Sequence, residues 1–318
     1  MELILLGLGL VILVVAGDLL VRGAVNLSLR LGVPTLVVGL TVVAFGTSAP
    51  ELLVAIEAVM KDLPGIALGN VVGSNIANIL LVLGLPALIS GIRSSECDSQ
   101  RSYLMMLGAS LLFIALCFFG PITWWHAGLL LAGLAFMLTD SYRHARRARR
   151  ESTADAADEI EELEEADPDM PYWRIALYLV AGLLGLPMGA DLLVDSASVI
   201  AERYGISDAV IGLTIVAVGT SLPELATSVM AALRRQADVA MGNVIGSNMF
   251  NLLGIIGISG LVGPIDIGPQ FLSFDLWVML GAAMVLFPFV MFCRDITRFW
   301  GGVLTALYAV YVTALLAL

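Results

Sequence analysis

The sequence predicts an all-α membrane protein with ten transmembrane helices, arranged as two inverted-topology repeats of five. Three observations lead to this fold class. Of the 318 residues, 59% are hydrophobic and only 14% are charged, whereas a soluble domain is nearer half apolar and a quarter charged. Apolar runs of about 20 residues, long enough to cross a bilayer, recur along the chain. The two halves also repeat each other's motifs. The chain is therefore expected to be a multi-pass protein of the cell membrane, with the lipid bilayer as a partner.

Ten apolar runs are expected to span the bilayer. The first includes MELILLGLGLVILVVAG, which lacks a basic amino-terminal region and stays apolar too long for a signal peptide. It is therefore interpreted as a spanning helix. The connections are short, apart from one charged segment after the fifth run. The expected spans are residues 3–25, 35–60, 65–90, 102–120, 123–141, 173–199, 208–233, 238–262, 271–292 and 299–317.

Basic residues lie almost entirely on one side of this arrangement. Of the 16 Lys and Arg residues, only Lys61 and Arg203 fall on the other side. Lys and Arg concentrate in the cytoplasmic connections of membrane proteins. The sequence therefore places both termini outside the cell and the long charged segment in the cytoplasm.

A charged linker is expected to separate the two repeats, which occupy residues 1–142 and 173–318. The linker, residues 143–172, opens with arginines and then holds ten acidic residues between Glu151 and Asp169. Such blocks of like charge are typical of solvated segments. We interpret it as a cytoplasmic linker, with ion sensing as the alternative.

The two halves match at a constant offset of 173 residues. GNVVGSNIAN at 69–78 aligns with GNVIGSNMFN at 242–251 at seven of ten positions, and GTSAPE at 46–51 aligns with GTSLPE at 219–224 at five of six. Each half has five spans, an odd number, so the second half is expected to be threaded upside down. Inverted repeats with interrupted helices at matching positions are typical of secondary transporters, whose site lies between the repeats near the membrane centre.

Prolines are expected to interrupt one helix in each repeat. Pro50 has no N–H to donate to the carbonyl of Gly46, and Pro223 leaves the carbonyl of Gly219 in the same state. Within lipid such carbonyls need another partner, and a bound cation is one. Side-chain oxygens recur beside both breaks and one helix further on, at Thr47, Ser48, Glu51, Ser74 and Asn78 in the first repeat and at Thr220, Ser221, Glu224, Ser247 and Asn251 in the second.

This oxygen-only set predicts a site for hard cations such as Ca²⁺ and Na⁺ rather than for soft metals. Each carboxylate at the bilayer centre costs about 2.5–3.5 kcal/mol. No Lys or Arg lies near the break in either GTSxPE helix to offset that cost. The three cysteines and two histidines are scattered, so no soft-metal site is expected.

The paired motifs resemble the two α-repeats of the sodium/calcium exchanger family, prokaryotic type, within the calcium/cation antiporter superfamily. The resemblance covers both halves of the chain. It implies a secondary antiporter that is not an enzyme, needs no cofactor, binds no nucleic acid and transports Ca²⁺ and Na⁺, with sliding of the first and sixth helices providing alternating access. By the resemblance, Glu51 and Glu224 are shared by both ions, Thr47, Ser48, Thr220 and Ser221 with the carbonyls of Ala44 and Ala217 form the Na⁺ sites, and Ser74, Asn78, Ser247 and Asn251 complete the centre.

Asn251 stands where some relatives carry aspartate, and its counterpart Asn78 is also neutral. Potassium dependence is therefore not expected, and the coupling ion stays open between Na⁺ and H⁺, because two protons neutralise two glutamates as well as one Ca²⁺ does.

A channel is disfavoured because channels usually have a symmetry axis along the membrane normal. A repeat of five spans gives a symmetry axis in the membrane plane instead. An intramembrane enzyme is disfavoured because no nucleophile–base pair is visible. Asp18, with Arg22 four residues later, is interpreted as structural. The protein is expected to be a monomer.

Overall fold

The computed structural model describes residues 2–93, 99–151, 167, 170–203 and 217–317, and this part of the chain is helical. It contains no strand, only two isolated bridges that join Ile92 to Ile296 and Ile122 to Ile265. The first half comprises α1 (Glu2–Leu31), α2 (Thr35–Val38), η1 (Gly39–Val43), α3 (Ala44–Thr47), α4 (Ala49–Met60), α5 (Pro64–Ala77), η2 (Asn78–Val82), α6 (Gly84–Ser90), α7 (Gln100–Phe118) and α8 (Trp124–Glu151), where η denotes a π-helical segment.

The second half repeats much of this order. It comprises α9 (Tyr172–Arg203), α11 (Ala217–Thr220), α12 (Leu222–Leu233), α13 (Ala237–Met249), η6 (Phe250–Ile255), α14 (Ile256–Val262), η7 (Phe271–Asp275), α15 (Leu276–Val285), α16 (Phe287–Met291) and α17 (Arg298–Ala317).

Seven helical stretches of the described residues are long and apolar enough to cross a membrane, or eight when the bent pair Thr35–Thr47 and Ala49–Met60 counts as one span. The expected span at 123–141 lies within α8, and the first part of the expected span at 208–233 lies outside the described residues. An all-α membrane protein is thereby confirmed. The count of ten spans in two inverted repeats stays a prediction.

The helix breaks occur where the prolines predict them. Ser48 separates α3 from α4 with φ −85° and ψ 5°, and Ser221 separates α11 from α12 with φ −90° and ψ 4°. Pro50 and Pro223 lie in the first turn of the helix that follows, where the missing N–H is tolerated. In the first half, the bend at the break is 44°.

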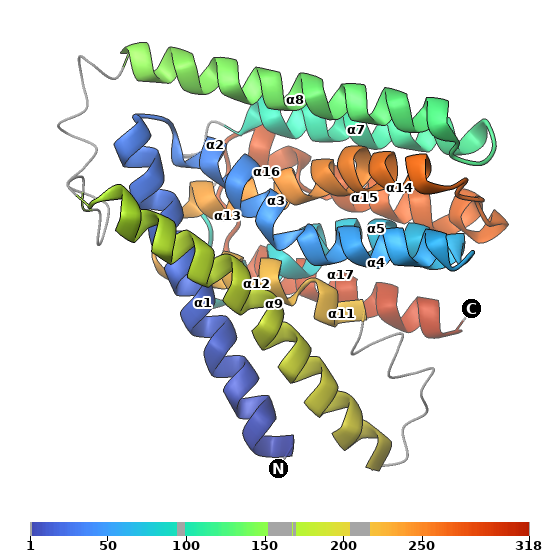
Figure 1. The fold of residues 1–318 in the computed structure, drawn as a ribbon, viewed down its shortest axis with the longest axis horizontal. Helices are drawn as coiled ribbons and strands as arrows, with labels where there is room; N and C mark the ends of the chain where they lie inside the picture. The colour runs from blue at the N-terminus through green and yellow to red at the C-terminus, as the bar shows by residue number, and fades with distance from the viewer. Residues whose placement is uncertain (1, 94–98, 152–166, 168–169, 204–216, 318) are drawn as a thin grey trace.

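Two long helices, α1 and α9, run side by side and obliquely to the other helices, and their far ends project from the bundle beside the N-terminus (Figure 1). Glycines allow their close approach, since a Cβ at Gly189 would lie 3.0 Å from the backbone nitrogen of Leu13 and 3.1 Å from the carbonyl oxygen of Gly9. An ion pair of 2.7 Å between Arg203 and Glu2 joins their projecting ends. The two helices are therefore packed as a pair.

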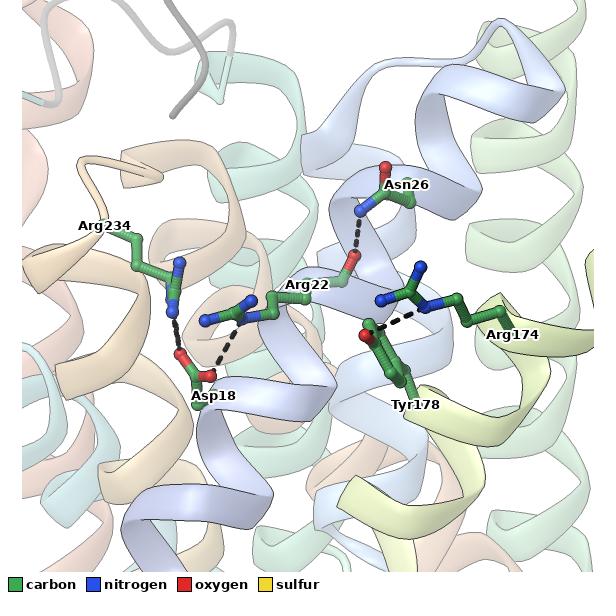
Figure 2. A network of polar contacts seen from close by, with 6 residues as sticks. All are labelled: Asp18, Arg22, Asn26, Arg174, Tyr178 and Arg234. Atoms are coloured by element: carbon green, nitrogen blue, oxygen red, sulfur yellow. Dashed lines mark hydrogen bonds and ion pairs between the residues drawn. The ribbon is translucent and has the colours of Figure 1, made fainter. Parts of the chain in front are cut away.

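A polar network connects this helix pair to the rest of the bundle (Figure 2). Asp18 on α1 forms ion pairs with Arg22 on the same helix, at 2.9 Å, and with Arg234 at the C-terminus of α12. The side-chain amide of Asn26 donates to the carbonyl of Arg22, and its oxygen accepts the backbone N–H of Asp167. Two arginines thus form ion pairs with the carboxylate of Asp18. This agrees with the interpretation of Asp18 as a structural residue rather than a cation ligand.

The basic part of the expected linker is helical, because α8 continues to Glu151. The expected boundary at 143 rests on charge alone, whereas arginine is a good helix former, so the helix continues through the basic run. Most of the acidic block lies outside the described residues, so both interpretations of it stay predictions.

Apolar and polar side chains are distributed as a bilayer requires. Large apolar residues such as Ile4, Leu53 and Phe119 are exposed on the surface of the bundle. Polar side chains such as Glu51 on α4, Ser74 on α5, Glu224 on α12 and Asn243 on α13 are buried instead. The interior of the bundle therefore holds a polar centre within an apolar shell.

Candidate cation-binding site

Two buried glutamates form the centre of the candidate site. Glu51 lies in the first turn of α4 and Glu224 in the first turn of α12, and each is 1% exposed. The hydroxyl of Ser48, three residues before Glu51, donates to Glu224, so the two glutamates lie in the same part of the bundle. Neither forms an ion pair with a Lys or Arg of the described residues. Both are therefore buried acidic groups without a counter-ion in the part of the chain that the structure describes.

An asparagine holds the backbone of each glutamate. Asn70 on α5 donates its side-chain amide to the carbonyl of Glu51, and Asn243 on α13 donates to the carbonyl of Glu224, both at 3.3 Å. These asparagines are not among the predicted site residues. Their recurrence at the 173-residue offset is the sequence signal that could have found them.

The break in the first repeat contacts the second repeat. The hydroxyl of Ser48 donates to Oε1 of Glu224 at 3.3 Å. The hydroxyl of Thr47 bonds to Oδ1 of Asn243 at 3.2 Å and lies 3.3 Å from the carbonyl oxygen of Ala44. The predicted residues Ala44, Thr47 and Ser48 are thus brought together with Glu224.

The corresponding residues of the second repeat are placed differently. Ser221 is buried at the break. Thr220 is half-buried and, together with Ser74, lines a cavity of about 430 Å³. Ala217 is the first residue of α11, one turn before the break.

Four asparagines form hydrogen bonds between the two repeats. The amide of Asn78 donates to Oδ1 of Asn248 at 3.0 Å, and the amide of Asn251 donates to Oδ1 of Asn75 at 3.3 Å. Asn78 opens η2 and Asn251 lies in η6. Such π-helical segments are rare and frequently occur at functional sites. Asn75 and Asn248 are not among the predicted residues, although they too recur at the 173-residue offset.

Six buried oxygens of the predicted residues have no hydrogen-bond partner among the residues that the structure describes. They are Oε2 of Glu51 and Glu224, Oδ1 of Asn78 and Asn251, and Oγ of Ser221 and Ser247. A buried polar atom without a partner costs about 1–3 kcal/mol, so a group of six is unusual unless a ligand satisfies it. In the described part of the chain, no group of three or more His, Cys, Asp or Glu residues could hold a metal ion. The candidate ligands are therefore two carboxylate oxygens and four neutral oxygens, a set that suits hard cations.

The comparisons with known proteins identify the family. The family profile described as sodium/calcium exchanger protein matches residues 1–142 and 174–317. The chain belongs to the sodium/calcium exchanger family. The exchanger is 35% identical over 281 residues to the inner membrane protein YrbG of Escherichia coli K12, covering 88% of this chain and 86% of the relative. It is 33% identical over 341 residues to the sodium/calcium exchanger MaX1 of Methanosarcina acetivorans, covering 98% and 97%.

The fold of the exchanger agrees with the family. A structure of the sodium-calcium exchanger NCX_Mj, soaked with 2.5 mM Na⁺ and 1 mM Sr²⁺, superposes with a TM-score of 0.83 at 32% identity, covering 98% of this chain and 97% of the other. The resemblance predicted from the paired motifs is thereby confirmed. The exchanger is a transmembrane cation antiporter of the calcium-transporting type.

Proposed function

We propose that the exchanger couples Na⁺ entry to Ca²⁺ export at the cluster formed by Glu51, Glu224 and the oxygens around them. The observation that carries this proposal is the set of six buried oxygens, two of them from Glu51 and Glu224, that have no hydrogen-bond partner among the described residues. A cation bound among them satisfies these atoms and neutralises the carboxylates together.

The charge and the number of oxygens support Ca²⁺ as one substrate. Two carboxylates provide two negative charges, which one Ca²⁺ balances. Ca²⁺ takes 6–8 oxygen ligands in flexible geometry, and the six oxygens above are of the required kind. Binding of one Ca²⁺ therefore needs no third carboxylate, and the neutral Asn251 is compatible with it.

The neutral oxygens support Na⁺ as the exchanged ion. Protons on Glu51 and Glu224 satisfy the carboxylates, whereas the amide oxygens of Asn78 and Asn251 and the hydroxyl of Ser221 are surplus to their needs. Na⁺ accepts carbonyl, amide and hydroxyl ligands, and the break in each repeat offers such atoms. MaX1 is named as a sodium/calcium exchanger, and NCX_Mj structures were obtained with Na⁺, Ca²⁺ and Sr²⁺, which supports the same ions here.

The pair of α1 and α9 supports alternating access. The two helices are joined to each other by close glycine contacts and by the pair Arg203–Glu2. The described contacts with the bundle include the ion pair between Asp18 and Arg234. A helix pair that moves as one body past the glutamates would expose them to either side of the membrane in turn.

Proton coupling is the second candidate. Two neighbouring carboxylates can bind two protons in place of one Ca²⁺, and this exchange would carry no net charge. The two mechanisms differ in their response to voltage, because each charge moved across the membrane is worth about 2.3 kcal/mol per 100 mV.

Ion flux into proteoliposomes tests the proposal, with Na⁺, K⁺ and pH gradients and the membrane potential imposed separately. We expect Ca²⁺ flux that follows the Na⁺ gradient, needs no K⁺ and changes with voltage, because more than two Na⁺ are expected to exchange for one Ca²⁺. Liposomes that contain the Glu51→Gln variant are the matched control. Ca²⁺ flux driven by a pH gradient alone and unaffected by Na⁺ or voltage would establish proton coupling instead.

A further inference from the structure

A third buried carboxylate lies outside the glutamate cluster. Asp275 on η7 is 4% exposed, and its Oδ1 has no hydrogen-bond partner among the described residues. No described Lys or Arg forms an ion pair with it. Tyr311 on α17, a neutral residue, lines the same cavity as Asp275. A buried carboxylate without a counter-ion is stabilised by a bound cation or by a proton.

The local backbone also sets Asp275 apart. It is the last residue of a π-helical segment, as Asn78 and Asn251 also lie in such segments. In all three residues, Oδ1 is buried and has no partner. A π-helical segment adds a residue to the turn and so redirects a side chain, and it is frequent at functional sites. Asp275 therefore shares a π-helical backbone and an unpartnered Oδ1 with two residues of the candidate site.

Asp275 faces a cavity that reaches the candidate site. The cavity of about 430 Å³ is lined by Asp275 and Tyr311 and also by Asn70, Ser74 and Thr220. Ser74 and Thr220 are predicted ligands, and Asn70 holds the backbone of Glu51. The cavity therefore joins the third carboxylate to the neighbourhood of the two glutamates.

We propose that Asp275 and Tyr311 form an additional binding site for a monovalent cation, in the cavity that leads to Ser74 and Thr220. One carboxylate balances one charge, which favours Na⁺ over Ca²⁺. Since a water molecule takes about 30 Å³ in the liquid, the cavity has room for a cation that keeps much of its hydration. The site concentrates the cation beside the glutamate cluster. Its use in transport rests on the proposed function, whereas the binding itself does not.

The binding is tested without the glutamate cluster, in the purified E51Q/E224Q double variant. The ²³Na NMR line of added NaCl is expected to broaden with this protein, and millimolar Ca²⁺ is expected not to reverse the broadening. Adding Asp275→Asn, which keeps the shape of the side chain, should abolish the excess line width. Adding Asp266→Asn instead is the matched control, because Asp266 is exposed and does not line the cavity. Equal broadening with D275N and D266N would overturn the proposal.

The wild-type protein provides a second measurement that depends on no variant. Crystals soaked in Tl⁺, a monovalent probe, are expected to show an anomalous peak beside Asp275, and the absence of this peak at saturating Tl⁺ would overturn the site.

The role of the site in transport is measured in proteoliposomes. There, D275N is expected to raise the Na⁺ concentration for half-maximal flux about fivefold, the effect of one unit charge near a hydrated cation. If flux proves to be proton-driven while the NMR and Tl⁺ results hold, the proposed function fails and the Asp275 site stands.

Discussion

At the scale of single residues, the candidate site combines groups that destabilise the ion-free protein. Glu51 and Glu224 are both buried, and neither forms an ion pair with a described Lys or Arg. Like charges in a poorly solvated place repel. Stability and function therefore conflict at these positions, as is common at binding sites. A substitution that removes a charge should separate the two properties.

We expect Glu51→Gln and Glu224→Gln each to lower Ca²⁺ affinity about 30-fold or more, since removing one partner of a buried charge pair costs about 2–5 kcal/mol. The melting temperature without ions should hold or rise, because an amide of similar shape removes the repulsion. Ca²⁺ titrations and thermal unfolding of the purified variants measure both. Glu57→Gln is the control, since Glu57 is exposed and pairs with Lys61. Near-normal Ca²⁺ binding by either variant would exclude a shared site.

At the scale of helices, the same motif packs differently in the two repeats. Gly242 on α13 touches the first half closely, because a Cβ there would lie 2.7 Å from the carbonyl oxygen of Leu36 and 3.0 Å from the nitrogen of Leu40. Its counterpart Gly69 on α5 has more room. In the described part of the chain, the nearest atom to a Cβ at Gly69 is a ring carbon of Phe271 at 3.7 Å. One glycine therefore permits helix contact, and the other lines a cavity.

We expect Gly242→Ala to destabilise the protein by about 1–3 kcal/mol, the usual cost of overpacking, because its methyl group meets backbone atoms that cannot rotate away. Gly69→Ala should change stability by much less. Thermal unfolding of the two variants in the same detergent gives the comparison. Equal losses of stability would show that the two α-repeats are packed alike.

At the scale of the whole molecule, the distribution of charge sets the expected orientation. Only Lys61 and Arg203 among the 16 basic residues fall on the expected outer side. Lys61 follows the end of α4, and Arg203 ends α9. The positive-inside rule depends on such a bias in short connections, so the exchanger is predicted to keep both termini outside.

Cysteine labelling tests this orientation in a background without Cys97, Cys117 and Cys293. In intact cells, an impermeant thiol reagent is expected to label Lys61→Cys and to leave Ile160→Cys unlabelled until the membrane is permeabilised. The first variant is the positive control for the second. Labelling of Ile160→Cys alone in intact cells would require the opposite orientation.

The sequence alone determined the features that follow from local chemistry. The helix breaks at Ser48 and Ser221 follow from Pro50 and Pro223, because proline removes the same N–H wherever it lies in a helix. The 173-residue repeat likewise identified the two glutamates that the structure buries.

Only the tertiary structure decided which partners meet. Ser48 donates to Glu224, 176 residues away, and pairing across repeats depends on how the helices pack rather than on any local pattern. Asp275 had no signal in the repeat, since the position 173 residues earlier is Ser102. Its carboxylate becomes notable only because η7 and α17 line one cavity together with Ser74 and Thr220. Local rules act over about four residues along a helix, whereas burial and missing counter-ions are properties of the packed bundle.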